Sequence, residues 1–172
     1  LRWLRQCGLE AAIHKAADAG TLVFGVCGGY QMLGRTVSDP EQVEAAGTTE
    51  ILGMGLLEMD TIFLGEKVQA QTTGVFAGIS GVLSDLNGMS YSGYEIHMGR
   101  SEEEMPALAG TGNVYGSYVH GVFDASGISD TILKALCVRK GIDFDALETF
   151  DISEYKEHQY DLLADAVRSG LD

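Results

Sequence analysis

The sequence predicts an α/β domain with three layers, in which a mixed, mostly parallel sheet carries helices on both faces. One observation is a short apolar run, residues 21–26, between two helical patterns; strands apolar on both faces are typical of a covered parallel sheet. Another is that several strand-like segments follow and two helices close the chain. Such a domain ordinarily has one or two strands before its first helix, so we expect the N-terminal strands to be missing here.

Apolar periodicity and turn residues define the individual elements. The first helix is expected over residues 4–19 and ends at Gly20. Strands are expected at 21–26, 56–64, 67–76, 94–98, 113–115 and 118–120. Residues 65–66 join the second strand to the third, 77–93 read as turns and loop, and 102–104 as an acidic solvated loop. The closing helices are expected at 127–140, with Ile128, Ile132, Leu133 and Leu136 inward, and at 152–169, with Tyr155, Leu162, Leu163, Ala166 and Val167 on the apolar side.

Length and composition are those of one globular domain, residues 1–172. A hydrophobic fraction of 45% argues against disorder throughout, and a net charge of −14 makes nucleic acid and anionic membranes poor partners. We find no apolar stretch long enough to span a membrane and no signal peptide. The chain does not begin with Met, so we expect a fragment or processed piece of a longer chain.

Three cysteines, Cys7, Cys27 and Cys137, lack the spacing of zinc or redox motifs. An odd number of cysteines in a chain of this kind favours free thiols in a reducing cytoplasm over a disulfide scaffold.

Cys27 stands at a predicted strand-to-helix turn, within Gly25-Val26-Cys27-Gly28-Gly29. The pattern parallels the G-x-S-x-G elbow of hydrolases, with sulfur in place of oxygen. The strained turn leaves no room for side chains two residues to either side, and the helix that follows should favour the thiolate and lower its pKa. The N–H of Gly28 is then placed to hold an oxyanion. We therefore predict that Cys27 is a nucleophile.

A cysteine nucleophile needs a base, and histidine serves near neutral pH. His14 and His158 lie on predicted surface helices. His97 and His120 lie at strand ends beside glycine, where α/β active sites gather. Spacing by itself does not choose between these two.

Five blocks of sequence resemble the C-terminal glutamine amidotransferase domain of cobyric acid synthases, which belong to the class I, triad-type amidotransferases. The blocks follow one another in the family's order: Gly25 to Gly34, Gly53 to Leu57, Gly93 to Gly99, Gly116 to Phe123 and Tyr160 to Asp165. The resemblance implies the family's fold and a role in cobalamin biosynthesis. It implies hydrolysis of glutamine, with the ammonia used by a separate ATP- and magnesium-dependent synthetase domain to amidate carboxylates of a corrin, adenosylcobyrinic acid a,c-diamide. No cofactor is implied for this domain itself.

The resemblance also implies residue roles. It matches the family's catalytic histidine to His120, leaves His97 a supporting or structural role, and matches Gln31 to a residue that helps to seat the substrate. Many relatives carry a glutamate two residues after the histidine, where this chain has Val122. Asp124 and Glu95 are then candidates for the third triad member, with no preference between them. The family's Gly-rich loop, which donates a second oxyanion N–H, is also absent, so we expect weak or no activity from this piece alone.

Three other interpretations stay open. A cysteine-type α/β-hydrolase uses a similar elbow, but it expects an acid and a late histidine in a longer chain. A related amidotransferase could act on another corrin or on a cell-wall precursor. An inactive interaction module would keep the fold and lose the chemistry.

Overall fold

The computed structural model describes residues 1–44, 47, 49–101, 106–125, 127–147 and 152–171. Its α-helices are α1 (Arg2–Gln6), α2 (Leu9–Asp18), α3 (Gly28–Leu33), α4 (Ile128–Lys140) and α5 (Ile152–Gly170). Its strands are β1 (Val23–Val26), β2 (Thr36–Ser38), β3 (Glu50–Leu52), β4 (Asp60–Val75), β5 (Ser90–Arg100), β6 (Ala109–Thr111) and β7 (Val114–Ser117). Short 3₁₀ turns are η1 (Gly81–Leu86), η2 (Val122–Asp124) and η3 (Phe144–Ala146). The predicted α/β class is confirmed.

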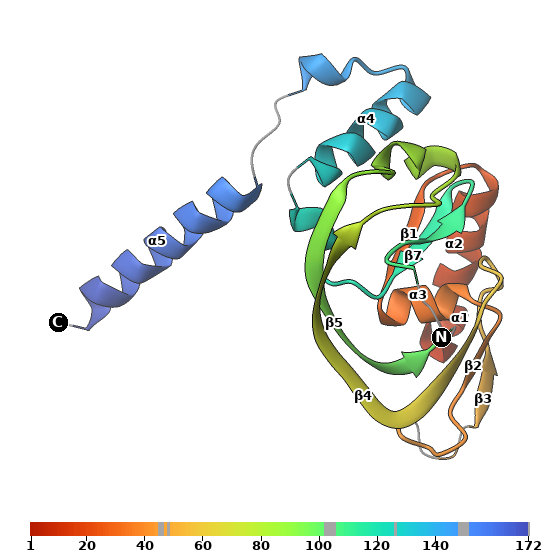
Figure 1. Ribbon diagram of the computed structural model, residues 1–172. Coiled ribbons are helices and arrows are strands. Elements are labelled where there is room, and N and C mark those ends of the chain that lie inside the picture. Colours follow the sequence, from red (N-terminus) through yellow and green to blue (C-terminus); the bar gives the residue numbers. More distant parts are fainter. Residues whose placement is uncertain (45–46, 48, 102–105, 126, 148–151, 172) are drawn as a thin grey trace.

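The strands form two sheets rather than the single mostly parallel sheet that we expected. One sheet has the order β1-β7-β6 and the other the order β3-β2-β4-β5. Parallel pairing joins β1 to β7 and β2 to β4, and the remaining pairs are antiparallel. The difference arises because β4 and β5 pair over most of their length into a long ribbon, which curves around the small sheet and α3 (Figure 1).

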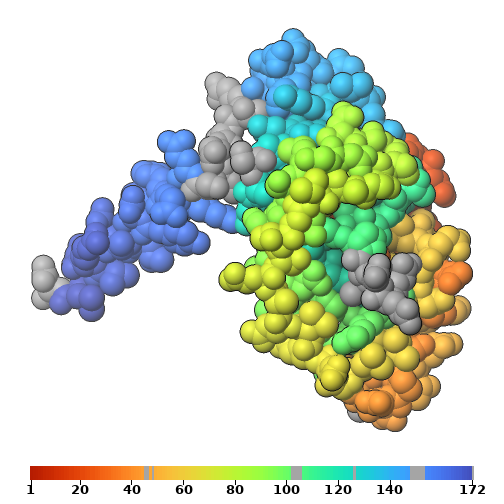
Figure 2. Space-filling model, in the orientation of Figure 1, coloured from red at the N-terminus to blue at the C-terminus, as the bar shows by residue number. Residues whose placement is uncertain are grey.

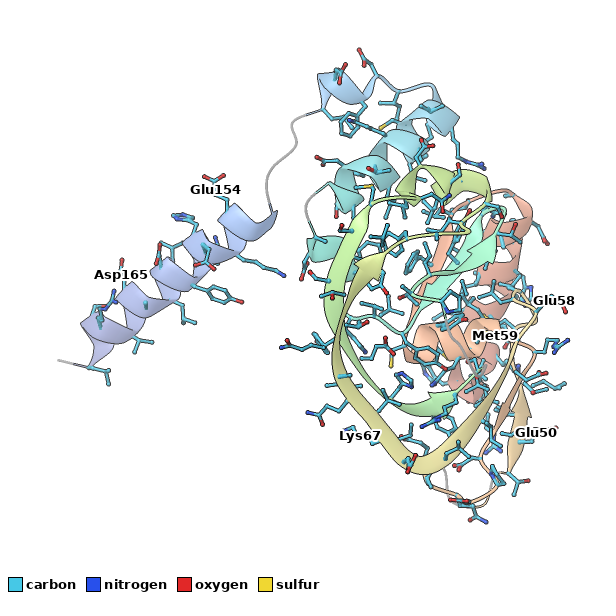
Figure 3. The ribbon with its side chains drawn as sticks, in the orientation of Figure 1. Glu50, Glu58, Met59, Lys67, Glu154 and Asp165 are labelled. Carbon is cyan, nitrogen blue, oxygen red and sulfur yellow. The ribbon has the colours of Figure 1, made fainter. Side chains whose placement is uncertain are left out.

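The small sheet lies at the centre and positions the segments discussed below. β1 pairs with β7 in parallel register, Val26 opposite Ser117, so the two strands end at the same edge. Two clusters of buried side chains pack beside it. One gathers around Tyr115, Leu83 and Ile128, and the other around Tyr30, Leu33 and Tyr118. The loop before β4 shows the same inside–outside division, since Met59 is buried while Glu58 points to solvent (Figure 3).

Several predicted boundaries are wrong. The helix expected over 4–19 is two helices, because Gly8 adopts a left-handed φ of 77° between α1 and α2. The two strands expected at 56–64 and 67–76 are the one strand β4, in which a register shift between Phe63 and Val68 replaces the turn. The loop expected to Gly93 gives way to β5 at Ser90, and β7 spans 114–117 in place of two short strands. The acidic loop at 102–104 lies outside the described residues.

The closing helices differ in how they are packed. In α4, Ile128 and Ile132 are buried as predicted, whereas Leu133 is 43% exposed and was wrongly placed inward. Helix α5 extends away from the body (Figure 1, Figure 2), and the apolar residues expected on its inner side are exposed, among them Leu162, Leu163 and Val167. Periodicity predicts which face of a helix is apolar but not whether a partner surface covers it. Within the described part of the chain, no helix combines the length and apolar character needed to cross a membrane.

Candidate active site

The predicted strand–turn–helix around Cys27 is confirmed. β1 ends at Val26, α3 begins at Gly28, and Cys27 between them has φ 51° and ψ −110°. A positive φ at a residue with a Cβ costs of order 1–3 kcal/mol and persists only where the surroundings impose it. The surroundings here are the hydrogen bonds of Cys27, whose N–H donates to Ser117 O at 2.8 Å and whose carbonyl accepts from the N–H of Gln31 at 3.1 Å.

The glycines around Cys27 differ in how much space a side chain would have, whereas the sequence predicts crowding on both sides of the cysteine. A Cβ on Gly25 would lie 2.6–2.7 Å from backbone atoms of Gly29 and Tyr30, so the turn requires glycine there. A Cβ on Gly28 or Gly29 would meet nothing within 4 Å. The expectation of crowding two residues after the cysteine is therefore wrong, because a Cβ on Gly29 would meet open space.

The sulfur of Cys27 is half-buried and lies 3.7 Å from the carbonyl oxygen of Ile96, to which the thiol can donate. Burial raises the pKa of this thiol above its ordinary value, and the carboxylate of Glu44 raises it further. The N–H of Gly28 acts in the opposite direction but is outweighed. The first N–H of α3 lowers the thiol pKa as expected, but the expected net lowering is wrong because desolvation is the larger effect.

His120 lies at the same edge of the small sheet as Cys27. It follows β7 by three residues, just as Cys27 follows β1 by one, and the parallel pairing of these strands brings their ends together. Strand β5 joins the two positions: the Ile96 carbonyl contacts the sulfur, and Tyr94 forms a β-bridge with His120. The imidazole of His120 also stacks on the ring of Tyr94, with centroids 5.1 Å apart.

His97 occupies a different environment. Its ring is buried, with Nδ1 donating to the carbonyl oxygen of Gly99 at 2.7 Å and Nε2 lying 3.1 Å from Oε2 of Glu95. The ring also stacks on Tyr118 at 4.0 Å between centroids. Both ring nitrogens are thus engaged in holding β5, which fits the supporting role expected from the resemblance.

The two candidates for the third triad member have other partners. Glu95 faces His97, and Asp124 accepts a hydrogen bond from Nζ of Lys156 at 2.5 Å. Among the described residues, no side chain hydrogen-bonds to the His120 ring.

Gln31 lies one turn into α3 and is buried beside β5, so close that a Cβ on Gly99 would lie 2.5 Å from its Nε2. Together with Gly28 it lines a cavity of about 510 Å³ next to the turn. The other lining residues are Leu1, Arg2, Trp3, Met32, Val37, Ile51 and Phe63. An amide in a cavity lined mostly by apolar side chains, with Arg2 as a second polar group, is suited to orienting a small ligand.

Sequence reasoning missed two parts of this site. The carbonyl of Ile96 meets the sulfur through the backbone, which no side-chain pattern reveals. Tyr94 stands in one of the five blocks, between Gly93 and the Glu95–His97 pair, so its place in that block was the only available signal. Neither contact follows from spacing, because 69 residues separate Cys27 from Ile96.

Comparison with known proteins gives consistent matches. Residues 1–128 match the model of the CobB/CobQ-like glutamine amidotransferase domain. A cobyric acid synthase of Lachnoclostridium phytofermentans is 47% identical across the whole chain, and one of Ruminiclostridium cellulolyticum is 44% identical. The chain spans 38% and 37% of the lengths of these two relatives. A solved structure described as a glutamine amidotransferase superposes with a TM-score of 0.47 at 19% identity, over 82% of this chain and 72% of that one.

Proposed function

The chain belongs to the CobB/CobQ-like glutamine amidotransferase domain family, and we propose that it hydrolyses glutamine with Cys27 as nucleophile and His120 as base. The observation that carries this proposal is the convergence of two strand ends. A cysteine held at positive φ and a histidine stacked on Tyr94 lie at one edge of the β1–β7 pair. Covalent acyl transfer requires a nucleophile and a base within reach of each other, and neighbouring strand ends place the two residues on the same edge of the sheet.

In the first half-reaction, His120 takes the proton of the Cys27 thiol as the sulfur attacks the side-chain amide carbon of glutamine. The amide oxygen becomes an oxyanion that accepts a hydrogen bond from the N–H of Gly28. The C–N bond then breaks, the imidazolium returns the proton to the departing nitrogen, and ammonia leaves. A thioester remains on Cys27.

In the second half-reaction, His120 removes a proton from water, and the oxygen attacks the thioester carbon. The C–S bond breaks, the sulfur recovers its proton from the imidazolium, and glutamate leaves. Burial raises the pKa of the Cys27 thiol and so favours the protonated sulfur, which is consistent with a role for a base in this reaction.

Gln31 and the cavity beside α3 are proposed to seat the substrate. The side-chain amide of Gln31 supplies hydrogen-bonding groups, and Gly28 lines the same cavity.

The ammonia is proposed to serve an ATP-dependent synthetase, since the matching relatives are cobyric acid synthases and more than half of their length lies outside the match. The acceptor would be a carboxylate of adenosylcobyrinic acid a,c-diamide, amidated on the way to cobyric acid in the cytoplasm. ATP and magnesium would bind to the synthetase.

Within the described residues, no group of three or more His, Cys, Asp or Glu side chains could hold a metal, and no step above uses one. The family model matches residues 1–128, and the extension of the same domain to residue 172 stays a prediction.

The test is to measure glutamate release from glutamine by the purified chain and to follow labelling by 6-diazo-5-oxo-L-norleucine, a glutamine mimic. Cys27→Ser and His120→Ala should abolish glutamate release, and mass spectrometry should find the label on Cys27. Cys7→Ser, which changes an exposed cysteine, is the matched control and should leave both rates unchanged. Release that survives Cys27→Ser, or label on another residue, would contradict the proposal. Faster hydrolysis of simple esters than of glutamine would favour the hydrolase interpretation.

The acceptor is tested separately in a chimera, in which this chain replaces the matching part of the Lachnoclostridium phytofermentans synthase. The chimera should restore cobyric acid formation in a strain that lacks its own enzyme, and the Cys27→Ser chimera should not do so with glutamine as the nitrogen donor.

A further inference from the structure

Tyr94 holds His120 through both its backbone and its ring. The N–H of Tyr94 donates to the carbonyl of His120 at 3.1 Å, and the N–H of His120 donates to the carbonyl of Tyr94 at 2.8 Å. The two rings lie nearly parallel, with an interplanar angle of 8° and centroids 5.1 Å apart. The backbone hydrogen bonds fix the position of His120, and the ring of Tyr94 packs against one face of its imidazole.

The neighbouring glycine shows that this approach is built into β5. A Cβ on Gly93 would lie 2.2 Å from the carbonyl oxygen of His120 and 2.6 Å from Cγ1 of Val119. A side chain there would push β5 away and break the bridge between Tyr94 and His120. Glycine at this position therefore permits the contact between the two rings.

The support matters because a catalytic imidazole needs an orienting partner. In the described part of the chain, no carboxylate hydrogen-bonds to His120: Glu95 faces His97 and Asp124 faces Lys156. Tyr94 is the aromatic ring that stacks on the imidazole, and an aromatic face also favours the imidazolium formed in each half-reaction.

We propose that Tyr94 is a positioning residue for the glutaminase reaction, holding the imidazole of His120 in the orientation from which it reaches the thiol of Cys27. The inference rests on the proposed function. The positioning role depends on the aromatic ring of Tyr94 and not on its hydroxyl group. An aromatic stack is worth roughly two- to tenfold in an equilibrium constant, which sets the scale of the effect.

The test compares Tyr94→Leu with Tyr94→Phe. Tyr94→Leu should lower kcat for glutamine by about fivefold to tenfold with little change in KM, while Tyr94→Phe keeps the kcat of the parent chain. The rate at which 6-diazo-5-oxo-L-norleucine labels Cys27 should fall by the same factor, which gives a readout where turnover is slow. Because Tyr94 is 47% exposed, both variants are expected to fold, and urea denaturation checks this.

Tyr91→Leu is the matched control, because Tyr91 lies on the same strand and stacks on Phe76 with centroids 4.8 Å apart, without touching His120. It should lower stability at least as much as Tyr94→Leu and leave kcat unchanged. Parental kcat in folded Tyr94→Leu, equal losses in the Phe and Leu variants, or an equal loss in Tyr91→Leu would each overturn the inference. If Cys27→Ser and His120→Ala are inactive while Tyr94→Leu is normal, only this inference fails; if those two retain activity, the proposed function fails.

Discussion

Substituting Gly25 by alanine tests the geometry of the turn that presents Cys27. The added Cβ would lie 2.6 Å from the carbonyl carbon of Gly29, 2.7 Å from its oxygen and 2.7 Å from the N of Tyr30. All three are backbone atoms, so no side-chain rotation relieves the overlap. The start of α3 must move away from β1, and the sulfur moves with it.

The magnitude follows from the cost of overpacking, which is typically about 1–3 kcal/mol in a closely packed interior. With a urea m-value of about 1–3 kcal/mol per molar, Gly25→Ala should lower the denaturation midpoint by about 1 M. Glutamate release should fall more steeply, because a displacement of about 1 Å at a reacting atom can cost on the order of 10² in rate. Urea denaturation followed by circular dichroism and a coupled glutamate assay measure the two quantities.

Gly29→Ala is the matched control within the same turn. Its Cβ would meet nothing within 4 Å, and alanine has a higher helix propensity than glycine, so its midpoint should be unchanged or higher. Two results would refute the reasoning: a Gly25→Ala midpoint equal to that of the parent chain, or equal losses in the two variants. Either result would mean that the close approach of α3 to β1 is not the reason why position 25 requires glycine.

Three further predictions concern charged groups. Alkylation of Cys27 by iodoacetamide should rise with pH to a midpoint above the value of about 8.5 of a free thiol, and Glu44→Gln should lower that midpoint because the carboxylate raises the thiol pKa; identical midpoints in the two chains would contradict this. Hydrogen bonds from Thr36 and Arg35 hold the pKa of Asp60 below its ordinary value. Its contribution to stability is therefore present above about pH 3.9 and is lost as the pH falls through the lowered value. Asp60→Asn should reduce the urea midpoint at neutral pH, with a difference that vanishes in strong acid; a difference that persists there would show a cause other than charge. Asp124→Asn should keep kcat within about threefold, because an exposed ion pair with Lys156 contributes little; a loss of tenfold or more would identify Asp124 as the partner of His120.

The local parts of the site could be predicted because their signals lie within a few residues. An apolar run followed directly by Cys27-Gly28-Gly29 predicts a strand, a strained turn and a helix, and the structure has all three. Spacing left His97 and His120 equivalent, since each ends a strand-like segment beside glycine. The structure separates them by burial and partners, which depend on what β5 and β7 pack against.

The sign of the pKa shift at Cys27 could not be predicted either. The sequence indicates that the helix after Cys27 lowers the thiol pKa. It does not reveal the desolvation that outweighs this effect, or the carboxylate of Glu44, which lies 17 residues further along the chain. Desolvation is a property of the packed structure, because it depends on every atom that excludes water from the sulfur.

The sequence by itself determined the class of the fold, the cysteine turn and the family resemblance, because each is recorded in contiguous residues whose backbone preferences and spacing act locally. Tertiary structure alone decided that β4 and β5 form one ribbon, that this ribbon carries Tyr94 to His120 and Ile96 to Cys27, and that α5 leaves its apolar side exposed. These outcomes depend on contacts between segments far apart in the chain, and the free energy of such contacts is set by packing and burial that no single segment contains.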